Sequence, residues 1–338
     1  MPYAFPFAPV LILIFFMILL FPQYSVEGAS DGLLLWFHTV LPALAPAMIF
    51  TRLILDIGGA SVLMRLLRPL FSRIFSLSEQ GSFILFCGML CGYPVGPSLC
   101  SRFLSQNQIS EKEASYLLAL CSYPSPMFLF GYVRQQLKEP VSPVLLFLGI
   151  YAPVFLLSAA AKSVIAYPDL SDRSKISEDP VSSVPVSQNA CTTFQGDPQH
   201  SGHSSGLDSI LYEVCDTMVL IGGYMMLFSI LVCFIRHAEW IPPRISAILC
   251  GIFEMTTGIH QICQTFPAAG QLPLSMASAA FGGISGIFQV KSVLVQGKKN
   301  AGFDIRHYIG WKLLHAGLSM LMITVLQLVL PLGFPQHW

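Results

Sequence analysis

Long apolar segments, each about as long as a membrane is thick, alternate with short polar segments along most of the chain. A helix needs about 20 predominantly apolar residues to cross the hydrocarbon core of a bilayer. The pattern therefore predicts an all-α, polytopic helical membrane protein. The uninterrupted candidate spans are residues 5–21, 32–57, 141–166, 209–235 and 309–332.

Other apolar segments are interrupted by glycine, proline or polar residues. The sequences GMLCGYPVGPS at 88–98 and GIFEMTTGI at 251–259 show this most clearly, and 113–132 and 272–290 are broken by Pro124 with Pro126 and by a cluster of glycines. An interrupted helix is tolerated within a membrane where it is buried in protein or lines a wet cavity. Such breaks at corresponding places in two halves of a chain indicate a transport site.

The order span, broken segment, broken segment, span occurs twice, so we predict an internal two-fold repeat. The expected divisions are an uncleaved N-terminal span at 1–27, a first gate-like repeat at 28–167, a flexible polar linker at 168–208 and a second repeat at 209–338. Cleavage of the first segment near Ala29 is the alternative. The linker is rich in Ser, Pro, Asp and Gly, a composition typical of disorder.

Basic residues between the spans predict the orientation, because cytoplasmic loops are enriched in Lys and Arg. If every broken segment crosses, there are nine crossings, the repeats are parallel, all basic loops lie on the cytoplasmic side and the linker lies outside. If the broken segments pair as re-entrant hairpins, the count falls to five. An inverted repeat requires one break to change the number of crossings.

The composition excludes several classes of function. The chain of 338 residues is 54% hydrophobic and 11% charged, with a net charge of zero, so it carries no electrostatic footprint for nucleic acid. Its nine cysteines lack zinc-ligand spacing, and no nucleophile, P-loop or dinucleotide motif is present. We therefore expect neither an enzyme nor a resident metal or cofactor, and the bilayer is the first partner.

The breaks supply the candidate substrate site. A half-helix that begins inside the membrane points free N–H groups and a positive dipole end at a polar or anionic ligand. Tyrosine rings and hydroxyl groups near the breaks would add stacking and hydrogen bonds, although local bonding and close helix packing are the alternatives. The candidates are Gly92, Tyr93, Pro94, Gly96, Ser98, Ser122, Tyr123, Ser125, Thr256, Thr257, Gly258 and Ser285.

Glu254 completes this set as a carboxylate inside an apolar segment. Ionisable groups within a membrane are costly, and they usually serve function and have a partner. Glu254 would bind a coupling proton or sodium ion, or brace the backbone N–H groups of the break. Its candidate partners are Arg52, Lys291, Lys312 and His315. An unpaired, ionised Glu254 would repel an anionic substrate.

The order LPALAPAMIF, CGYPVGPS, YPSP, IGGYMMLFS and FEMTTG resembles the YlbJ (SpoVV) family of sporulation integral membrane proteins, which carry nucleoside-recognition gate segments. The resemblance covers most of the chain from about residue 28, and Pro97 departs from the family, which commonly has a small or basic residue there. It implies a protein of the outer forespore membrane that moves dipicolinic acid, a small anionic substrate, from mother cell to forespore. A homo-oligomer or other sporulation membrane proteins are the implied protein partners.

Two other functions fit the same residues. The gate segments also suggest a nucleoside-type transporter, whose substrate would be neutral. A non-transporting membrane scaffold for spore envelope assembly would use the breaks only for packing.

Overall fold

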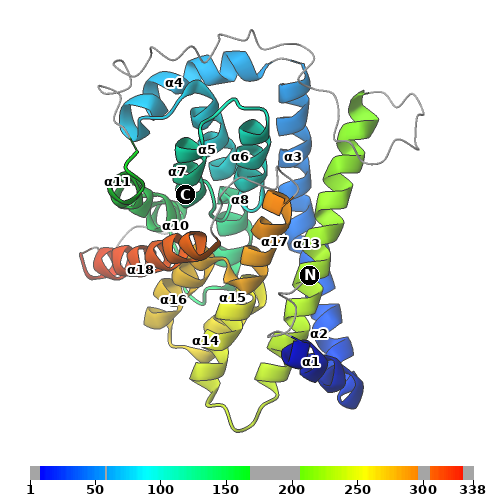
Figure 1. Ribbon diagram of the computed structural model, residues 1–338. Helices are drawn as coiled ribbons and strands as arrows, with labels where there is room; N and C mark the ends of the chain where they lie inside the picture. Colours follow the sequence, from blue (N-terminus) through cyan, green and yellow to red (C-terminus); the bar gives the residue numbers. More distant parts are fainter. Residues whose placement is uncertain (1–7, 58, 168–205, 296–304, 330–338) are drawn as a thin grey trace.

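The computed structural model describes residues 8–57, 59–167, 206–295 and 305–329, and these form helices without a strand. Helical stretches at Pro22–Ile54, Pro143–Ile165, Gly206–Arg236 and Ile305–Val329 are long and apolar enough to cross a membrane. Many of their apolar side chains face outward, as expected where lipid replaces water as the solvent. The prediction of an all-α, polytopic membrane protein is therefore confirmed (Figure 1).

The first half begins with α1 (Ala8–Leu20), which bends at Phe21 into α2 (Pro22–Leu35). A π-helical turn, η1 (Trp36–Val40), joins α2 to α3 (Leu41–Asp56), so that all three continue as one long rod. The 13 residues described for α1 give a length of about 20 Å. This is shorter than the hydrocarbon core of about 30 Å. The predicted boundary of the first span at residue 27 falls inside α2, because residues 22–27 belong to that helix.

Helix α4 (Ala60–Phe75) lies across one end of the bundle (Figure 1). In this helix Phe71 and Phe75 are buried, whereas Arg65 and Arg68 are exposed. That division is typical of a helix at the membrane interface.

The two most conspicuous breaks are tips of helical hairpins. Helices α5 (Glu79–Cys91) and α6 (Val95–Ser105) form the first hairpin, and α14 (Pro243–Phe253) and α15 (Met255–Thr265) form the second. In the second hairpin the two arms touch through glycines, because a Cβ atom on Gly258 would lie 2.1 Å from Gly251 Cα. Each arm is about 16 to 20 Å long, which is shorter than the hydrocarbon core of about 30 Å. Each hairpin therefore enters the protein part of the way and returns to the same end.

The other two breaks bend a helix without reversing it. Helix α7 (Glu111–Leu120) leads through residues 121–125 into α8 (Pro126–Phe128), the π-helical turn η2 (Leu129–Val133) and α9 (Arg134–Gln136). Helix α16 (Ala268–Phe281) leads through Gly282 into α17 (Gly283–Val295). Each half then ends in a span, formed by α10 (Pro143–Tyr151) with α11 (Pro153–Ile165) and by α18 (Ile305–Val329).

The two halves run in opposite directions. The rod α2–η1–α3 packs antiparallel against α13 (Gly206–Arg236), since Gly28 contacts Ile230 and Arg52 pairs with Glu213 at 3.5 Å. The hairpins therefore enter from opposite ends of the bundle, and the repeat is inverted. The expectation of a parallel repeat is wrong. Of the two broken segments in each half, one is a hairpin that returns to its starting end and the other is a bent helix that crosses to the opposite end.

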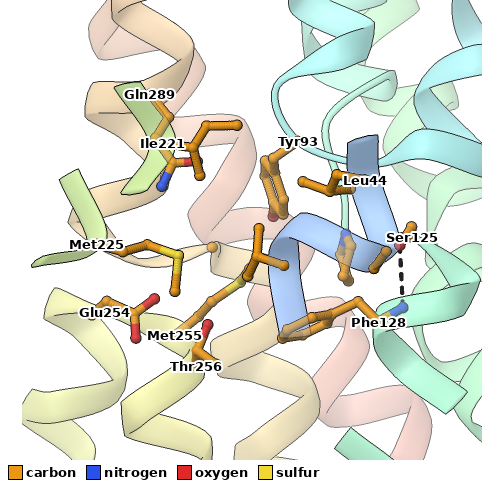
Figure 2. A pocket seen from close by; sticks show the side chains of 15 residues that line it. Leu44, Tyr93, Ser125, Phe128, Ile221, Met225, Glu254, Met255, Thr256 and Gln289 are labelled. Carbon is orange, nitrogen blue, oxygen red and sulfur yellow. Dashed lines mark hydrogen bonds between the residues drawn. The ribbon is translucent and has the colours of Figure 1, made fainter. Parts of the chain in front are cut away.

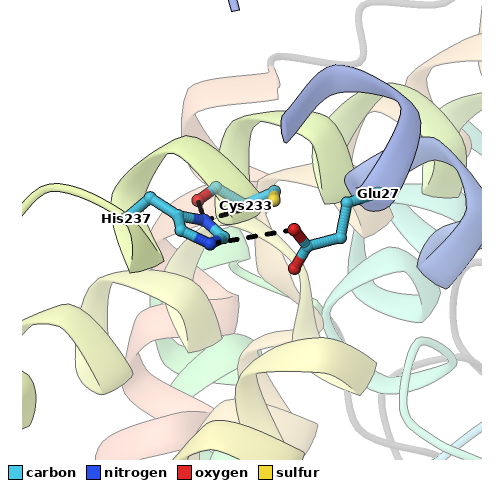
Figure 3. A group of neighbouring side chains, drawn as sticks. All are labelled: Glu27, Cys233 and His237. Carbon is cyan, nitrogen blue, oxygen red and sulfur yellow. Dashed lines mark hydrogen bonds and ion pairs between the residues drawn. The ribbon is translucent and has the colours of Figure 1, made fainter. Parts of the chain in front are cut away.

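An ion-pair cluster fixes one end of this antiparallel packing (Figure 3). Glu27 of α2 lies 3.5 Å from Arg236 and 3.7 Å from His237 Nε2, while His237 Nδ1 lies 2.9 Å from Cys233 O. Glu27, Cys233 and His237 are close enough to suggest metal ligands. Because the Arg236 guanidinium also pairs with Glu27 and with Asp31 at 3.1 Å, we interpret the cluster as an ion-pair network.

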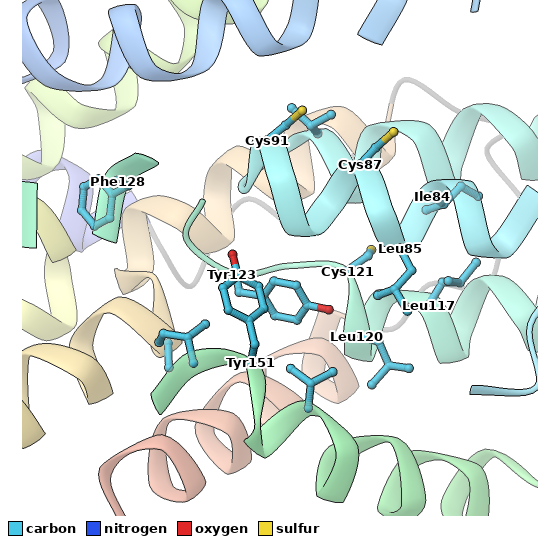
Figure 4. Packing of buried hydrophobic residues seen from close by; sticks show 14 of the residues in the cluster. Ile84, Leu85, Cys87, Cys91, Leu117, Leu120, Cys121, Tyr123, Phe128 and Tyr151 are labelled. Atoms are coloured by element: carbon cyan, nitrogen blue, oxygen red, sulfur yellow. The ribbon is translucent and has the colours of Figure 1, made fainter. Parts of the chain in front are cut away.

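Most of the core of the first half is aliphatic and aromatic. Ile84, Leu85, Leu117 and Leu120 are almost fully buried between α5 and α7, next to Tyr123 of the bend after α7 (Figure 4). Serine caps start both helices: Ser78 Oγ accepts from Gly81 N at 3.0 Å, and Ser110 Oγ accepts from Glu113 N at 3.2 Å.

Basic side chains lie at both ends of the bundle. At the α4 end, Arg68 pairs with Glu79 at 2.8 Å, and Lys162 Nζ donates to Ser76 Oγ at 2.8 Å. Arg236, at the end of α13, belongs to the opposite end. The prediction that all basic loops share one side is wrong. The chain returns to the same end of the bundle after each hairpin, but it crosses to the opposite end through the bent helix that follows.

The residues next to the predicted linker lie at the α4 end. Tyr167 Oη donates to Ser76 O at 3.1 Å, and Gly206 lies beside Asp56 at the end of α3. The linker itself falls outside the described residues, so its predicted disorder stays a prediction. More basic residues lie at the α4 end than at the other, which favours the α4 end as cytoplasmic. The prediction that the linker lies outside is then wrong, because both of its flanks lie at the α4 end. The basic residues at the α4 end include Arg65, Arg68, Arg73, Arg102, Lys112 and Lys162, and those at the other end include Arg134, Lys138, Arg236 and Arg244.

Thiol labelling of intact cells tests this orientation. In a background with Cys191 and the exposed Cys215 replaced by serine, a membrane-impermeant maleimide is expected to label Trp240→Cys, at the tip between α13 and α14, and not Arg65→Cys on α4. Permeabilised cells should label both. Labelling of Arg65→Cys alone in intact cells would reverse the orientation, and equal labelling of both would contradict the antiparallel arrangement of the halves.

Candidate functional site

Both hairpin tips and both bends meet at one cavity between the halves (Figure 2). The first hairpin contributes Tyr93 and the second contributes Glu254 with the start of α15. The bends contribute Ser125 and Gly282, and the antiparallel rods α3 and α13 close the remaining side. Of the predicted site residues, Tyr93, Ser125, Glu254 and Thr256 line this cavity.

Helices α6, α8, α15 and α17 begin beside the cavity, each one to two residues after a lining residue. The helix that begins at α8 continues through η2 to Gln136. Helix N-termini carry free N–H groups and positive partial charge. The arrangement therefore directs the positive ends of helices from both halves at a single space.

The cavity is small in this conformation. Its volume is about 40 Å³, which is room for a few water molecules, whereas a cavity that binds benzene has about 150 Å³. The walls are mostly apolar, with Leu44 of α3 and Met225 of α13 among them. A planar aromatic substrate would therefore require a hairpin or a rod to move outward.

The Glu254 carboxylate caps its own helix. Its Oε2 atom accepts from Thr257 N at 2.7 Å and from Thr257 Oγ1 at 2.9 Å, and Glu254 is 2% exposed. The side chain therefore braces the break, as one of its predicted roles requires. None of its four predicted basic partners forms an ion pair with it among the described residues.

The threonines after Glu254 differ in their hydrogen bonds. Thr257 Oγ1, besides donating to Glu254, lies 3.4 Å from Ser229 Oγ of α13. The Thr256 backbone carbonyl accepts from Tyr132 Oη at 2.7 Å, which ties the second hairpin to η2 of the first half. The Thr256 hydroxyl is buried at the cavity, close to the Glu254 carboxyl group, and has no hydrogen-bond partner of good geometry among the described residues.

Tyr93 links the first hairpin to the second bend. Its hydroxyl donates to Ala280 O at 3.0 Å, at the end of α16, and its ring contacts Gly282. Gly282 has φ +83°, a conformation that favours glycine. The Lys312 ammonium of α18 donates to the same Tyr93 hydroxyl. One side chain thus connects a tip, a bend and a span.

The residues of the first bend bind mainly to other parts of the protein. Ser122 Oγ lies 2.7 Å from Tyr308 Oη of α18, and Ser125 Oγ accepts from Phe128 N at 3.2 Å as the cap of α8. Tyr123 is fully buried, and its hydroxyl has no hydrogen-bond partner among the described residues. It packs against Tyr151, whose hydroxyl donates to Pro124 O at 3.0 Å.

The remaining predicted residues have packing roles. Gly92 has φ +77° and lies against Ser125, while a Cβ on Gly96 would lie 2.1 Å from Cys121 O. Gly258 packs on Gly251 in the same way. Pro94 precedes α6, Ser98 is partly buried one turn further, and Ser285 Oγ accepts from Gln289 Nε2 at 3.2 Å.

Several residues of the wall were not predicted from the sequence. Leu44, Ile221 and Met225 are apolar members of apolar spans, and no feature of their sequence separates them from lipid-facing neighbours. Gln289 of α17 also lines the cavity. Its amide, seven residues after Gly282 in an apolar segment, was the one available signal.

Comparison with protein-family models, curated proteins and solved structures finds no match for this chain.

Proposed function

We propose that the protein is a membrane transporter and that its substrate binds in the cavity between the two halves. The observation that carries this proposal is the convergence of two oppositely inserted hairpins and two bent helices on that one space. An inverted pair of repeats can open a central site to either side in turn, because equivalent movements of the two halves have opposite directions. The small cavity fits the closed state of such a cycle.

Dipicolinic acid is our first candidate substrate, moved from mother cell to forespore across the outer forespore membrane. The resemblance to the sporulation family suggests this compound, and the chemistry of the cavity supports a planar anion. Helix N-termini from both halves favour negative charge, and the Tyr93 ring offers a stacking surface. The Glu254 carboxyl group is already engaged by the start of α15.

A nucleoside-type substrate is the second candidate. No Lys, Arg or His side chain lines the described cavity, and its one carboxylate, Glu254, is an acceptor suited to ribose hydroxyls. The Thr256 hydroxyl, which has no hydrogen bond of good geometry within the described part of the chain, suits either substrate.

Flux measurements in proteoliposomes distinguish these functions. Radiolabelled dipicolinate and radiolabelled uridine would be offered separately, with and without a pH gradient. We expect saturable dipicolinate flux that excess uridine does not inhibit. Saturable uridine flux alone would favour the nucleoside function, and no flux of either compound from folded protein would favour the scaffold.

Tyr93→Ala is expected to lower dipicolinate flux by about tenfold or more, because it removes the stacking surface and the link between the first hairpin and the second bend. The matched control is Tyr212→Ala, at a residue of α13 that is 71% exposed. Spore dipicolinate content and the amount of protein in the membrane would be measured together. Normal spore dipicolinate in Tyr93→Ala would contradict the assignment of the site.

A further inference from the structure

Lys312 is a buried lysine that has no acidic partner among the residues that the structure describes. It lies on α18 with 2% of its surface exposed, and its ammonium donates to Tyr93 Oη and to Ser122 O at 2.6 Å. The ammonium also lies 4.5 Å from the centre of the Tyr93 ring. Among the described residues, no carboxylate lies within ion-pair distance of it.

These contacts only partly compensate a buried charge. Burying an ammonium without a paired anion is costly, even where neutral acceptors satisfy its hydrogen bonds. Ser122 O follows the C-terminus of α7, and Tyr93 Oη also contacts the last carbonyls of α16, so the negative ends of two helices face this region. A helix end stabilises a nearby charge by less than the burial of an ion without a counter-ion costs. An ammonium at this site would therefore still be stabilised by an anion.

Lys312 lies directly behind the cavity wall. Tyr93 lines the cavity, and the Lys312 ammonium contacts both the hydroxyl and the ring of that tyrosine. Tyr93 belongs to the tip of the first hairpin, whereas Ser122 and Lys312 belong to the bend and to α18. Outward movement of the hairpin would carry Tyr93 away and leave the ammonium facing the enlarged cavity.

We propose that Lys312 is the counter-ion for a carboxylate group of the substrate and that Tyr93 occupies its place in the closed state. This proposal rests on the proposed transport function and extends it to substrate charge. The ligand class is a small carboxylate, and a planar aromatic acid fits best because Tyr93 already presents a ring and a hydroxyl to the ammonium. In the closed state and in the substrate-bound state, Ser122 O accepts a hydrogen bond from the Lys312 ammonium and so positions it.

Binding to the purified full-length protein tests the proposal. The ligands are radiolabelled dipicolinate, a competition panel of picolinate, phthalate and benzoate, and pyridine-2,6-dicarboxamide as a neutral compound of the same shape. The variants are Lys312→Met, Lys312→Arg and Lys162→Met, the last a matched control at the end of α11. Methionine is chosen because replacing a buried charge by an apolar side chain of similar size often preserves stability.

Lys312→Met is expected to weaken dipicolinate binding by about tenfold or more, in keeping with the loss of a charge-assisted hydrogen bond, and to leave the diamide unchanged. Lys312→Arg should retain part of the affinity, and Lys162→Met should bind as the wild type does. Tyr93→Phe, which keeps the ring but removes the competing acceptor, should bind dipicolinate at least as tightly.

The outcomes separate this inference from the choice of substrate. If the wild type binds another acid of the panel and loses it in Lys312→Met, the counter-ion proposal stands and dipicolinate is the wrong substrate. Equal weakening of acid and diamide in Lys312→Met, unchanged acid binding in that variant, or no binding of any acid to the wild type would each overturn the counter-ion role. Size-exclusion profiles and melting temperatures of each variant would confirm that the folded protein is compared.

Discussion

Gly258→Ala is expected to destabilise the protein by about 3 kcal/mol or more, at the upper end of what overpacking a well-packed core costs. The added Cβ would lie 2.1 Å from Gly251 Cα and 2.3 Å from Gly251 N. Both atoms belong to the backbone of the opposite arm, so no side-chain rotation relieves the clash. The arms of the second hairpin would have to separate, which would also displace Glu254 at the tip. A lower melting temperature of the purified protein is the expected measurement.

Gly223→Ala is the matched control for this change. Gly223 lies on α13, and a Cβ there would meet no atom within 4 Å. Alanine should be neutral or slightly stabilising there, because it favours a helix over glycine by about 1 kcal/mol. Gly96→Ala should reproduce the loss in the first hairpin, where the Cβ would lie 2.1 Å from Cys121 O. Equal melting temperatures for the position 258 and 223 variants would contradict the close packing of the second hairpin.

The sequence predicted where the helices break but not which breaks reverse the chain. Glycine and proline interrupt a helix in either case, and the difference depends on whether the flanking arms can touch. The glycines on either side of each tip, Gly88 with Gly96 and Gly251 with Gly258, allow that contact or place both arms against one neighbour. Their near-symmetric spacing was a usable signal. Without it, an inverted repeat could not be distinguished from a parallel one.

The candidate site was predictable where polar residues mark the breaks. Tyr93, Ser125, Glu254 and Thr256 were identified in this way and line the cavity. Lys312 was predicted as a possible partner for Glu254, and it contacts Tyr93 instead. That contact joins residues 219 positions apart in the chain. No local sequence pattern indicates a contact between residues so far apart. The apolar wall from α3 and α13 was equally inaccessible, because residues that face a partner helix and residues that face lipid are both hydrophobic in a span.

Glu254→Gln and Glu254→Ala are expected to separate the structural and transport roles of this side chain. Glutamine keeps an acceptor for Thr257 N, so the cap of α15 survives and stability should change by less than about 1 kcal/mol. Alanine removes the cap and should cost about 1 to 2 kcal/mol. If the carboxylate carries the coupling proton or contacts the substrate, both variants should lose flux, by about tenfold or more for glutamine.

Dipicolinate flux with and without a pH gradient, together with the melting temperature, provides the measurement for this pair. Glu79→Gln is the matched control, because Glu79 is a partly exposed acid that pairs with Arg68 far from the cavity. A glutamine variant that keeps its stability and loses the response to the pH gradient would assign proton coupling to Glu254. Normal flux in the glutamine variant with reduced stability in the alanine variant would leave the carboxylate with capping alone. The coupling group would then have to be sought elsewhere in the protein.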